Sequence, residues 1–498
     1  MFDDKLFEIL PGAVGFFRQN PSLTFGGLSE KLNSAISQPS EVLIKAISFQ
    51  APGLTGSPGK VEDLGEKNPA PQAAAFYGQG VLAANHHGFD THPEMVQGSV
   101  LFGLKAALGD AKNPVIVLAS SAVPLNNPTN PGGFCLGRSG SSGRRLKARV
   151  FPRSRDRVMV SRAPRLTKKD LTGFLGRLGD LPDWEEAEKK AAKLYCEKYL
   201  LAEDFLNAPN FLAQASHLAL AGWVDRFSEM APPFFQLDLE SLVLSCLKVD
   251  LANADSAAAL ALFDPEKRSA LIHSLADKRG AWSKALLDPT LAPGDFSETE
   301  SLGTLFFWAV DGQGRRRPMG LGRKGSDFTL RGAEHELPLS PQRLATALSE
   351  KSLVPGLFMD YLVLAYHGLM AHGGVFMIDY LPALLGPASK ILETPLGPMG
   401  ELNSLEKKPL LAAGFQPLGL ASPQGEAFSS AGALELFAAG PLTPQALNQL
   451  AQTPLNAAWP FTSGQWYQEE VPPNDRLALW EKRLGRPAVC LNDFGLSW

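Results

Sequence analysis

The chain has 498 residues, of which 45% are hydrophobic and 20% charged, a balance that is typical of a globular protein and excludes a largely disordered one. The formal net charge of -4 excludes a protein that binds polyanions with its whole surface. The length leaves room for two or three domains, or for one domain with insertions.

The cysteines and the first residues indicate a reducing compartment. Cys135, Cys196, Cys246 and Cys490 form no close pair in the sequence, which excludes a disulfide scaffold and a thiolate zinc ribbon. The segment MFDDKLFEIL is acidic where a signal peptide would be basic. No uninterrupted apolar stretch approaches the roughly 18 residues that a membrane-spanning helix needs. We therefore expect a cytoplasmic protein with no membrane partner.

The clearest predicted unit follows an N-terminal helical segment over 1–50 and a Pro/Gly-rich connection over 51–72. AFYGQGVLAANHH (75–87) is a short apolar run that predicts a buried strand, and NPVIVLASS (113–121) predicts a second one. Between them, Thr91 is placed to cap a helix with proline in its first turn and glutamate at the capping-box position. Strand, helix and strand at this spacing predict a βαβ unit with a parallel strand pair.

The rest of the chain predicts a mixed α/β class without a clear linker. A basic hairpin is expected over 144–164, and GTLFFWAVD (303–311) opens an antiparallel meander. Ser340 precedes a further helix, and 353–371 predicts a strongly apolar one. The predicted units, which also fit one elaborated domain, are 1–50 (helical segment), 73–165 (α/β core with basic hairpin), 167–290 (helical region), 300–400 (meander and apolar helix) and 401–498 (irregular helical region).

Five of the eight histidines fall in two short windows, HHGFDTH (86–92) and HGLMAH (367–372). His86 and His87 end the first predicted parallel strand, and His92 lies in the first turn of the helix that follows. Ligands of open α/β sheets bind at the carboxyl ends of the strands. The start of a helix favours an anionic ligand and keeps nearby imidazoles neutral, which is the form that binds metals and accepts protons.

Asp90 and Glu94 add carboxylates to the same loop, so two chemistries are open. In the first, His86, His87 and His92 bind a divalent metal ion such as zinc, and a carboxylate orients or deprotonates a bound water. In the second, a histidine and Asp90 form an acid/base pair without metal. Adjacent histidines on a strand point to opposite faces, so the metal version requires the strand to have ended before them. The helical H-E-x-x-H pattern is absent.

The second histidine window has a functional and a structural interpretation. His367 lies near the predicted C-terminus of a helix, where the helix dipole alone favours a protonated imidazole. In the functional interpretation, the following glycines let the backbone approach a ligand there. The predicted catalytic residues are His87, Asp90, Glu94 and His367.

The loop SSAVPLNNPTNPGGF (120–134) follows the second strand and should emerge beside the histidines. Its asparagines fit either the binding of a polar substrate or ordinary turn formation. Cys135 beyond it is expected to be a buried, inert thiol rather than a nucleophile. The predicted substrate-binding residues are Asn85, Ser120, Asn126, Asn127 and Arg138.

The stretch Arg138–Lys169 holds twelve Lys and Arg residues and the single acid Asp156, and Arg315–Arg317 forms a second basic group. This pattern fits the recognition of phosphate or RNA, or a solvated face that balances an acidic body. Phe151 is the only aromatic residue of the stretch, so a base-stacking platform is lacking. GLGRKG (320–325) matches G-x-G-x-x-G but precedes a predicted strand, and no P-loop occurs, so no nucleotide cofactor is expected.

Together these patterns predict an enzyme whose His/Asp-rich site lies at a strand-to-helix junction. It would carry out metal-assisted hydrolysis or acid/base lyase or isomerase chemistry on a small anionic substrate. The alternative is a non-catalytic protein that binds RNA or an acidic partner through the basic 138–169 hairpin. We place His87 on a loop at the surface edge, where replacement by alanine would cost on the order of 1 kcal/mol in stability.

Overall fold

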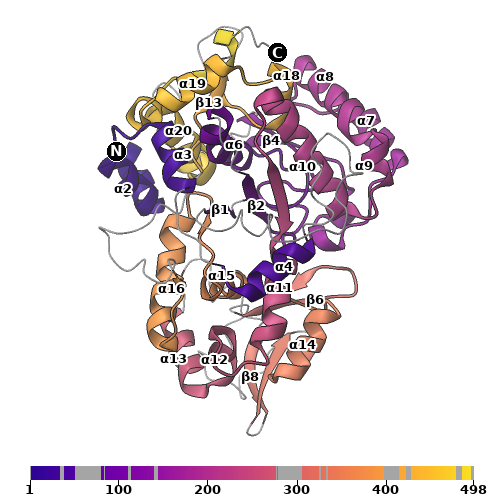
Figure 1. Ribbon diagram of the computed structural model, residues 1–498. Coiled ribbons are helices and arrows are strands. Elements are labelled where there is room, and N and C mark those ends of the chain that lie inside the picture. Colours follow the sequence, from indigo (N-terminus) through magenta and orange to yellow (C-terminus); the bar gives the residue numbers. More distant parts are fainter. Residues whose placement is uncertain are drawn as a thin grey trace.

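The computed structural model describes residues 2–33, 39–50, 80–83, 85–109, 114–139, 144–275, 278, 306–324, 327–332, 335–397, 414–421, 428–477 and 485–494. It confirms the mixed α/β class. In Figure 1 the N-terminal helix α2 (Pro11–Gln19) lies in the upper part of the molecule with the C-terminal helices α19 (Pro444–Gln452) and α20 (Leu455–Glu470). Helices α12 (Ala257–Phe263) and α14 (Pro341–Ser349) lie in the lower part.

A four-stranded parallel sheet lies at the centre, in the order β12-β1-β2-β5. Strand β1 (Val81–Leu82) continues through α6 (Pro93–Leu108) into β2 (Val115–Ala119), which confirms the predicted βαβ unit. The outer strands are β12 (Ala371–His372) and β5 (Phe234–Asp238). The carboxyl ends of all four strands therefore meet at one edge.

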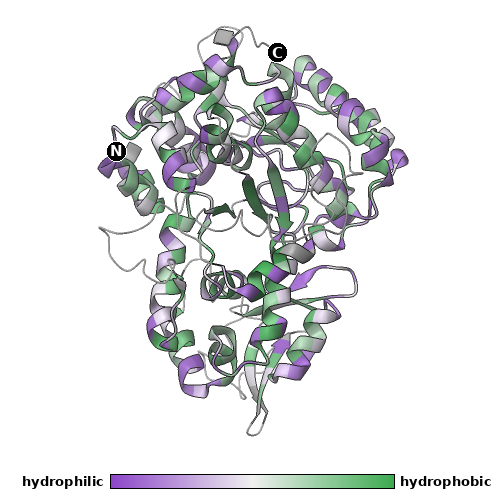
Figure 2. Cartoon of the chain, in the orientation of Figure 1, coloured by the Kyte–Doolittle hydropathy of each residue, from purple (hydrophilic) through white to green (hydrophobic). Residues whose placement is uncertain are grey.

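Both faces of this sheet are buried, which explains why β2 reads as an unbroken apolar run. Val115 and Val117 contribute to one hydrophobic core, whereas Ile116 and Leu118 contribute to another. Alternation of this kind within a continuous apolar strand is expected for a parallel sheet covered on both sides. In Figure 2 the strands at the centre are correspondingly coloured as hydrophobic. The helices packed around the two cores include α3 (Phe25–Asn33), α4 (Glu41–Gln50), α11 (Leu239–Asp250) and α15 (Leu357–Tyr366).

The sheet contains two strands that the sequence patterns did not predict. Strand β5 lies within the region predicted to be helical, between α10 (Phe211–Phe227) and α11. Its sequence, FFQLD, holds three apolar residues, and a segment this short cannot be distinguished from a helical turn by periodicity alone. Strand β12 has two residues and follows directly on the apolar helix α15. The helical character of the rest of 168–275 agrees with the prediction.

The basic hairpin lies upstream of its predicted range. Strand β3 (Gly133–Ser139) pairs antiparallel with β4 (Arg145–Arg149), so only the start of 144–164 is a strand. Pro152 follows β4 and lacks the N–H that a strand requires, and the chain continues in 3-10 turns at Arg153–Arg155 and Val160–Arg162.

The predicted antiparallel meander is present in the second half of the chain. Its strands form two sheets, with the orders β10-β9-β8 and β11-β6-β7. Ser340 caps α14 by accepting a hydrogen bond from the backbone N–H of Arg343, as the sequence predicts. The strands are β6 (Phe307–Val310), β7 (Arg316–Arg317), β8 (Gly320–Lys324), β9 (Asp327–Gly332), β10 (His335–Pro338) and β11 (Leu353–Pro355).

The remaining elements complete the layers around the sheet. They are α1 (Phe2–Ile9), α7 (Lys168–Leu178), α8 (Glu186–Tyr195), α9 (Glu203–Asn207), α13 (Pro265–Leu275), α16 (Met377–Leu392), α18 (Ala433–Ala439), β13 (Leu418–Ala421), β14 (Phe428–Ser430) and β15 (Val489–Cys490). Within the described residues, no helix combines the length and the apolar character needed to cross a membrane.

Candidate functional site at the carboxyl edge of the parallel sheet

The segments that follow β1 and β2 lie side by side at the carboxyl edge of the sheet. His86 and Ser120 form a parallel bridge, in which Ser120 N donates to the carbonyl of Asn85 at 3.0 Å and His87 N donates to the carbonyl of Ser120 at 2.9 Å. The backbone is therefore still paired as a strand at the two histidines. Because successive side chains of a strand alternate in direction, the imidazoles of His86 and His87 point to opposite sides.

His86 is held by a short hydrogen-bonded chain from the loop after β2. Its Nδ1 lies 2.8 Å from Oγ1 of Thr129, and that hydroxyl donates to Oδ1 of Asn127 at 3.1 Å. The same Oδ1 accepts the backbone N–H of Thr129 at 3.2 Å, which identifies it as the amide oxygen. When the hydroxyl gives its only proton to Asn127, it accepts a hydrogen bond from Nδ1 of His86. In that arrangement a neutral His86 carries its lone pair on Nε2, which has no hydrogen-bond partner among the described residues.

The surroundings of His86 keep the imidazole neutral. Burial first, and then the positive charge of Arg316, lower its pKa to about 4. Arg316 lies over the ring of Trp308 at 4.5 Å from the ring centre, and both side chains are half-buried. Burial lowers the pKa of Arg316 and Glu240 raises it. A guanidinium thus lies close to a neutral imidazole, in an arrangement suited to holding an anion beside a base.

Glu240 closes the edge between β2 and β5. Its carboxyl group accepts hydrogen bonds from Oγ of Ser120 at 2.5 Å, from the N–H of Ser121 at 2.7 Å and from the N–H of Ala122 at 3.0 Å. Burial and then Asp238 raise its pKa to about 7, against the effect of these hydrogen bonds. Ser120, predicted to bind substrate, is engaged with Glu240. Sequence reasoning missed Glu240 because it lies just after the unpredicted strand β5.

His87 lies on the other side of the strand and is buried. Only 2% of its surface is exposed, and its Nδ1 has no hydrogen-bond partner among the described residues. Burial lowers the pKa of His87, while the carboxylate of Asp238 opposes this effect. Asp238 caps α11 with Oδ1, which accepts the N–H of Ser241 at 2.9 Å. The expectation that His87 lies at a surface edge is wrong, because the sheet pairing continues through His86 and carries His87 into the interior.

Asp90 faces away from the histidine pair, towards α10. Its φ of 43° lies in the left-handed region, and its Oδ2 accepts a hydrogen bond from Nδ2 of Asn85 at 3.0 Å. Burial raises the pKa of Asp90 to about 6, and Arg226 opposes the shift. No interaction within the described part of the chain joins Asp90 to His87. The predicted acid/base pair of a histidine with Asp90 is therefore not formed among the described residues, and the side chain that bonds to Asp90 is Asn85.

His92 and Glu94 belong to a second group of titratable side chains, at the start of α6. Oε1 of Glu94 accepts the N–H of Val375 at 3.1 Å, and burial together with Glu469 raises the pKa of Glu94 to about 8. Burial lowers the pKa of His92 to about 3, with Glu469 opposing. Glu469 itself forms an ion pair with Arg145, which lowers the pKa of Glu469 although burial acts against it.

His367 lies at the opposite edge of the sheet. Its Nδ1 is 2.6 Å from Oγ of Ser40, and its Nε2 is 3.1 Å from both carboxylate oxygens of Asp250. Helix α4 begins beside Ser40 and ends at Gln50, which bonds to the backbone of Asp238 at the carboxyl edge. A helix of ten residues is about 15 Å long, so His367 and His87 do not share a site.

The other predicted residues lie outside the group that His86 forms with Thr129, Asn127 and Arg316. Nη2 of Arg138 bonds to Oε2 of Glu188 at 2.7 Å, and the side chain of Asn126 is exposed. Cys135 is buried and burial raises the pKa of its thiol to about 11, as expected for an inert cysteine. The side chain of Asn127 is joined to the imidazole of His86 through Thr129, whereas Ser120 is joined to His86 and His87 through the backbone alone.

The predicted ligands do not form a metal site. In the part of the chain that the structure describes, no three His, Cys, Asp or Glu side chains are arranged to hold a metal ion. His86 and His87 point to opposite sides of the strand, and His92 faces Glu469. These residues therefore do not fit the predicted zinc ion.

No protein-family model matches the sequence, and no curated protein shows significant similarity to it. The functional argument consequently depends on the geometry of the site.

Proposed function

We propose that the protein is an acid/base enzyme that acts on a small anionic substrate, with His86 as the proton-accepting group. The observation that carries the proposal is the chain Asn127–Thr129–His86, which favours a proton on Nδ1 and a basic Nε2. An oriented, neutral imidazole at the carboxyl ends of parallel strands is suited to general base catalysis.

Arg316 is the residue we assign to the substrate's negative charge. It lies near enough to His86 to lower the pKa of the imidazole, and it stacks on Trp308, which fixes the plane of the guanidinium. A carboxylate or phosphate bound there would neutralise the positive charge. The basicity of His86 would then rise when the substrate is present, which favours proton removal from the bound substrate over removal from other molecules.

The proton balance of the reaction is simple. Nε2 of His86 takes a proton from the substrate or from a water molecule beside it, and the imidazolium then gives the proton to the product or to the leaving group. Proton removal from substrate corresponds to a lyase or isomerase, and proton removal from water corresponds to hydrolysis. Glu240 supports the site by holding the ends of β2 and β5 together through Ser121 and Ala122.

Reaction with diethyl pyrocarbonate tests this proposal, because the reagent acylates neutral, accessible imidazole nitrogens. Peptide mapping by mass spectrometry should show modification of His86 and protection by inorganic phosphate or malonate. Arg316→Gln should abolish the protection. Arg317→Gln is the matched control, because its guanidinium is exposed and bonds to Asp311 at 3.0 Å. An unmodified His86, or protection that survives in Arg316→Gln, would contradict the proposal.

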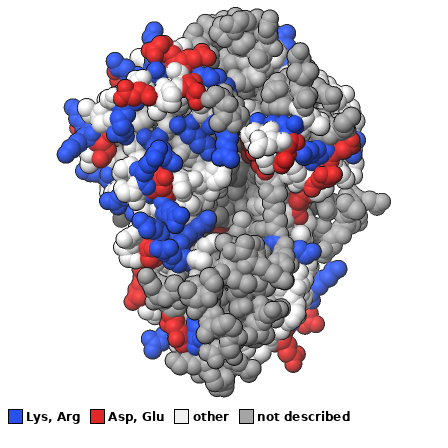
Figure 3. All heavy atoms as spheres, turned by 180° about the vertical axis from the view of Figure 1, so that it is seen from behind, with Lys and Arg blue, Asp and Glu red and all other residues white. Residues whose placement is uncertain are grey.

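A second candidate function, sequence-independent RNA binding, is favoured by the way two basic groups meet. Val158 pairs with Arg315 in an antiparallel bridge, and Met159 N donates to the carbonyl of Gly314 at 2.9 Å. The two basic segments of the sequence are thereby joined. In Figure 3, Lys and Arg side chains gather on the left of the face shown, beside a hollow near its middle. Exposed cations of the first segment are Arg144, Lys147, Arg149, Arg153, Arg155, Arg157, Arg162, Arg165, Lys168 and Lys169.

Salt dependence distinguishes this second candidate from the first. Phe151 is buried, so the surface offers phosphate contacts without base stacking, and affinity for RNA should fall steeply with salt. The double variant Arg153→Gln/Arg155→Gln should reduce the slope of log affinity against log salt by about 2. Fluorescence anisotropy with a labelled single-stranded RNA measures this slope. Binding that does not depend on salt would exclude the candidate.

A further inference from the structure

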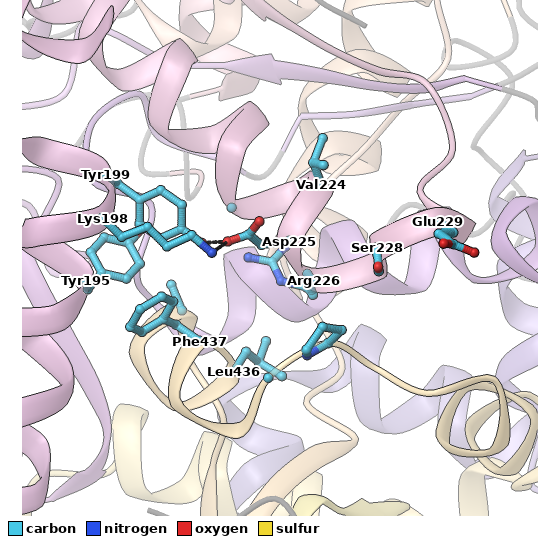
Figure 4. A pocket seen from close by; sticks show the side chains of 14 residues that line it. Tyr195, Lys198, Tyr199, Val224, Asp225, Arg226, Ser228, Glu229, Leu436 and Phe437 are labelled. Atoms are coloured by element: carbon cyan, nitrogen blue, oxygen red, sulfur yellow. Dashed lines mark hydrogen bonds and ion pairs between the residues drawn. The ribbon is translucent and has the colours of Figure 1, made fainter. Parts of the chain in front are cut away.

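A cavity of about 410 Å³ lies between α10, α18 and the turn that follows α8, away from His86. Its volume is within the range of sites for small organic ligands. Figure 4 shows Tyr195, Tyr199 and Phe437 grouped on one side, with Arg226 between this group and Ser228. The ring centres of Tyr195 and Tyr199 are 5.2 and 5.5 Å from that of Phe437, so the three rings form one aromatic wall.

The charged side chains beside the aromatic wall already have partners, with one exception. Asp225 forms an ion pair with Lys198 and accepts the hydroxyl hydrogen of Tyr199 (Figure 4). Lys198 also lies over the rings of Tyr199 and Phe437, at 5.2 and 5.8 Å. The positive charge of Lys198 and the negative charge of Asp225 therefore compensate each other.

The exception is Arg226. A guanidinium has five N–H donors, yet none of the described residues accepts a hydrogen bond from this one. Its Nε has no exposed surface and no partner there. Burial lowers the pKa of Arg226, and the nearest compensating group is Asp90, whose carboxyl is bonded to Asn85. A largely buried, unpaired guanidinium is costly, and an anion on the pocket side would satisfy it.

We propose that this cavity binds a small monocarboxylate with an apolar or aromatic body. The carboxylate would accept hydrogen bonds from Arg226, and the body would lie against Tyr195, Tyr199 and Phe437. A doubly charged phosphate fits less well, because Lys198 is already paired with Asp225 and Arg226 alone remains to balance its charge among the cationic side chains that line the cavity. The site differs from the proposed catalytic site, since Arg226 faces Asp90 and Arg316 faces His86.

Gly222 provides a variant that fills the cavity and leaves Arg226 in place. It lies within α10, and a Cβ added there would meet only Nη2 of Arg226, at 4.0 Å. Replacement by leucine also favours a helix, so Gly222→Leu should fold. Gly176→Leu is the matched control, because Gly176 lies within α7 with nothing within 4 Å of an added Cβ and lines none of the described cavities.

Phenylacetate is the probe, measured by isothermal titration calorimetry against acetate and the uncharged phenylacetamide. Wild type and Gly176→Leu should bind phenylacetate with a Kd near or below ~1 mM, and the other two compounds at least ~10-fold more weakly. Arg226→Gln should weaken phenylacetate binding by ~10-fold or more, and Gly222→Leu should abolish it. Equal binding of phenylacetate and phenylacetamide, undiminished binding to Gly222→Leu, or no saturable binding to wild type would overturn the proposal.

Discussion

The backbone N–H of Ser121 donates to a carboxylate oxygen of Glu240 at 2.7 Å, which ties the end of β2 to the first turn of α11. Ser120 and Ala122 bond to the other oxygen of the same carboxylate. One side chain thus satisfies three consecutive residues at the sheet edge. Thr129 and Asn127 lie in the loop that begins at Ser120, which these hydrogen bonds anchor. Glu240 therefore helps to position both residues relative to His86.

Glu240→Gln should destabilise the protein by about 2 kcal/mol or more, because the amide NH₂ would face backbone N–H groups that need an acceptor. Chemical denaturation at constant pH measures the loss. Glu266→Gln is the control, since Glu266 also lies in the first turn of a helix and is exposed. Equal stability of the two variants would contradict the assigned role.

His87→Ala should cost about 2 kcal/mol or more, rather than the smaller loss expected for a surface loop. The reason is that the side chain is only 2% exposed and its removal leaves a cavity. His273→Ala, on an exposed face of α13, should change the free energy of unfolding by less than about 0.5 kcal/mol. If both variants unfold at the same denaturant concentration as wild type, the side chain of His87 is not buried in the core.

Glu94→Gln should change how stability depends on pH. The pKa of Glu94 is about 8 in the folded protein and its ordinary value is 4.5, so the folded state alone holds the proton between these values. This carboxyl therefore makes the wild type less stable as the pH rises from 4.5 to 8, by up to about 1.4 kcal/mol per pH unit. The glutamine variant lacks this contribution, so its stability relative to wild type should increase with pH.

Thermal or chemical unfolding across pH 4.5 to 8 measures that difference. Glu203→Gln, which removes an exposed first-turn carboxylate of α9, controls for the loss of one charge. A stability difference between Glu94→Gln and wild type that is constant with pH would refute the raised pKa.

Asp250→Asn should destabilise the junction of α4, α11 and α15 by about 2 kcal/mol or more. His367 is buried and bonds to Asp250 through Nε2 and to Ser40 through Nδ1, so an uncharged partner weakens a buried polar chain. Asp255→Asn, at an exposed position, is the control. A similar small effect of both substitutions on the melting temperature would show that His367 does not hold these helices together.

The βαβ unit could be predicted because β1, α6 and β2 carry strong local signals, namely an unbroken apolar run and a proline in the first turn of a helix. The predicted cap was one residue early, since His92 and not Thr91 is the N-cap residue, and the hydroxyl of Thr91 donates to the carbonyl of Gly133. Strand β5 was not predicted, since FFQLD holds three apolar residues between two helices and has no distinctive period. Glu240 was hidden for the same reason. The choice of His87 over His86 failed to anticipate that the strand pairing extends to His86, which reverses which imidazole is buried.

Contacts between residues that are distant in the sequence also could not be predicted from local patterns. Glu469 approaches His92 and Glu94 from the C-terminal helix α20, and Arg316 approaches His86 from β7. Nothing local to residues 86–94 indicates either contact. The asparagine of the loop after β2 was predicted as a binding residue, and in the structure Asn127 reaches the histidine through Thr129.

The proposed function requires that neutral His86 carries its proton on Nδ1 and its lone pair on Nε2. Nitrogen-15 NMR of the imidazole ring at pH 7 distinguishes the two tautomers directly, with His86→Gln to assign the signals. We expect a protonated Nδ1 and an unprotonated Nε2 in the wild-type protein. The ratio of the two tautomers should change in Thr129→Val, which removes the acceptor hydroxyl. A ring protonated on Nε2 in the wild-type protein would contradict the proposed role of His86 as the proton acceptor.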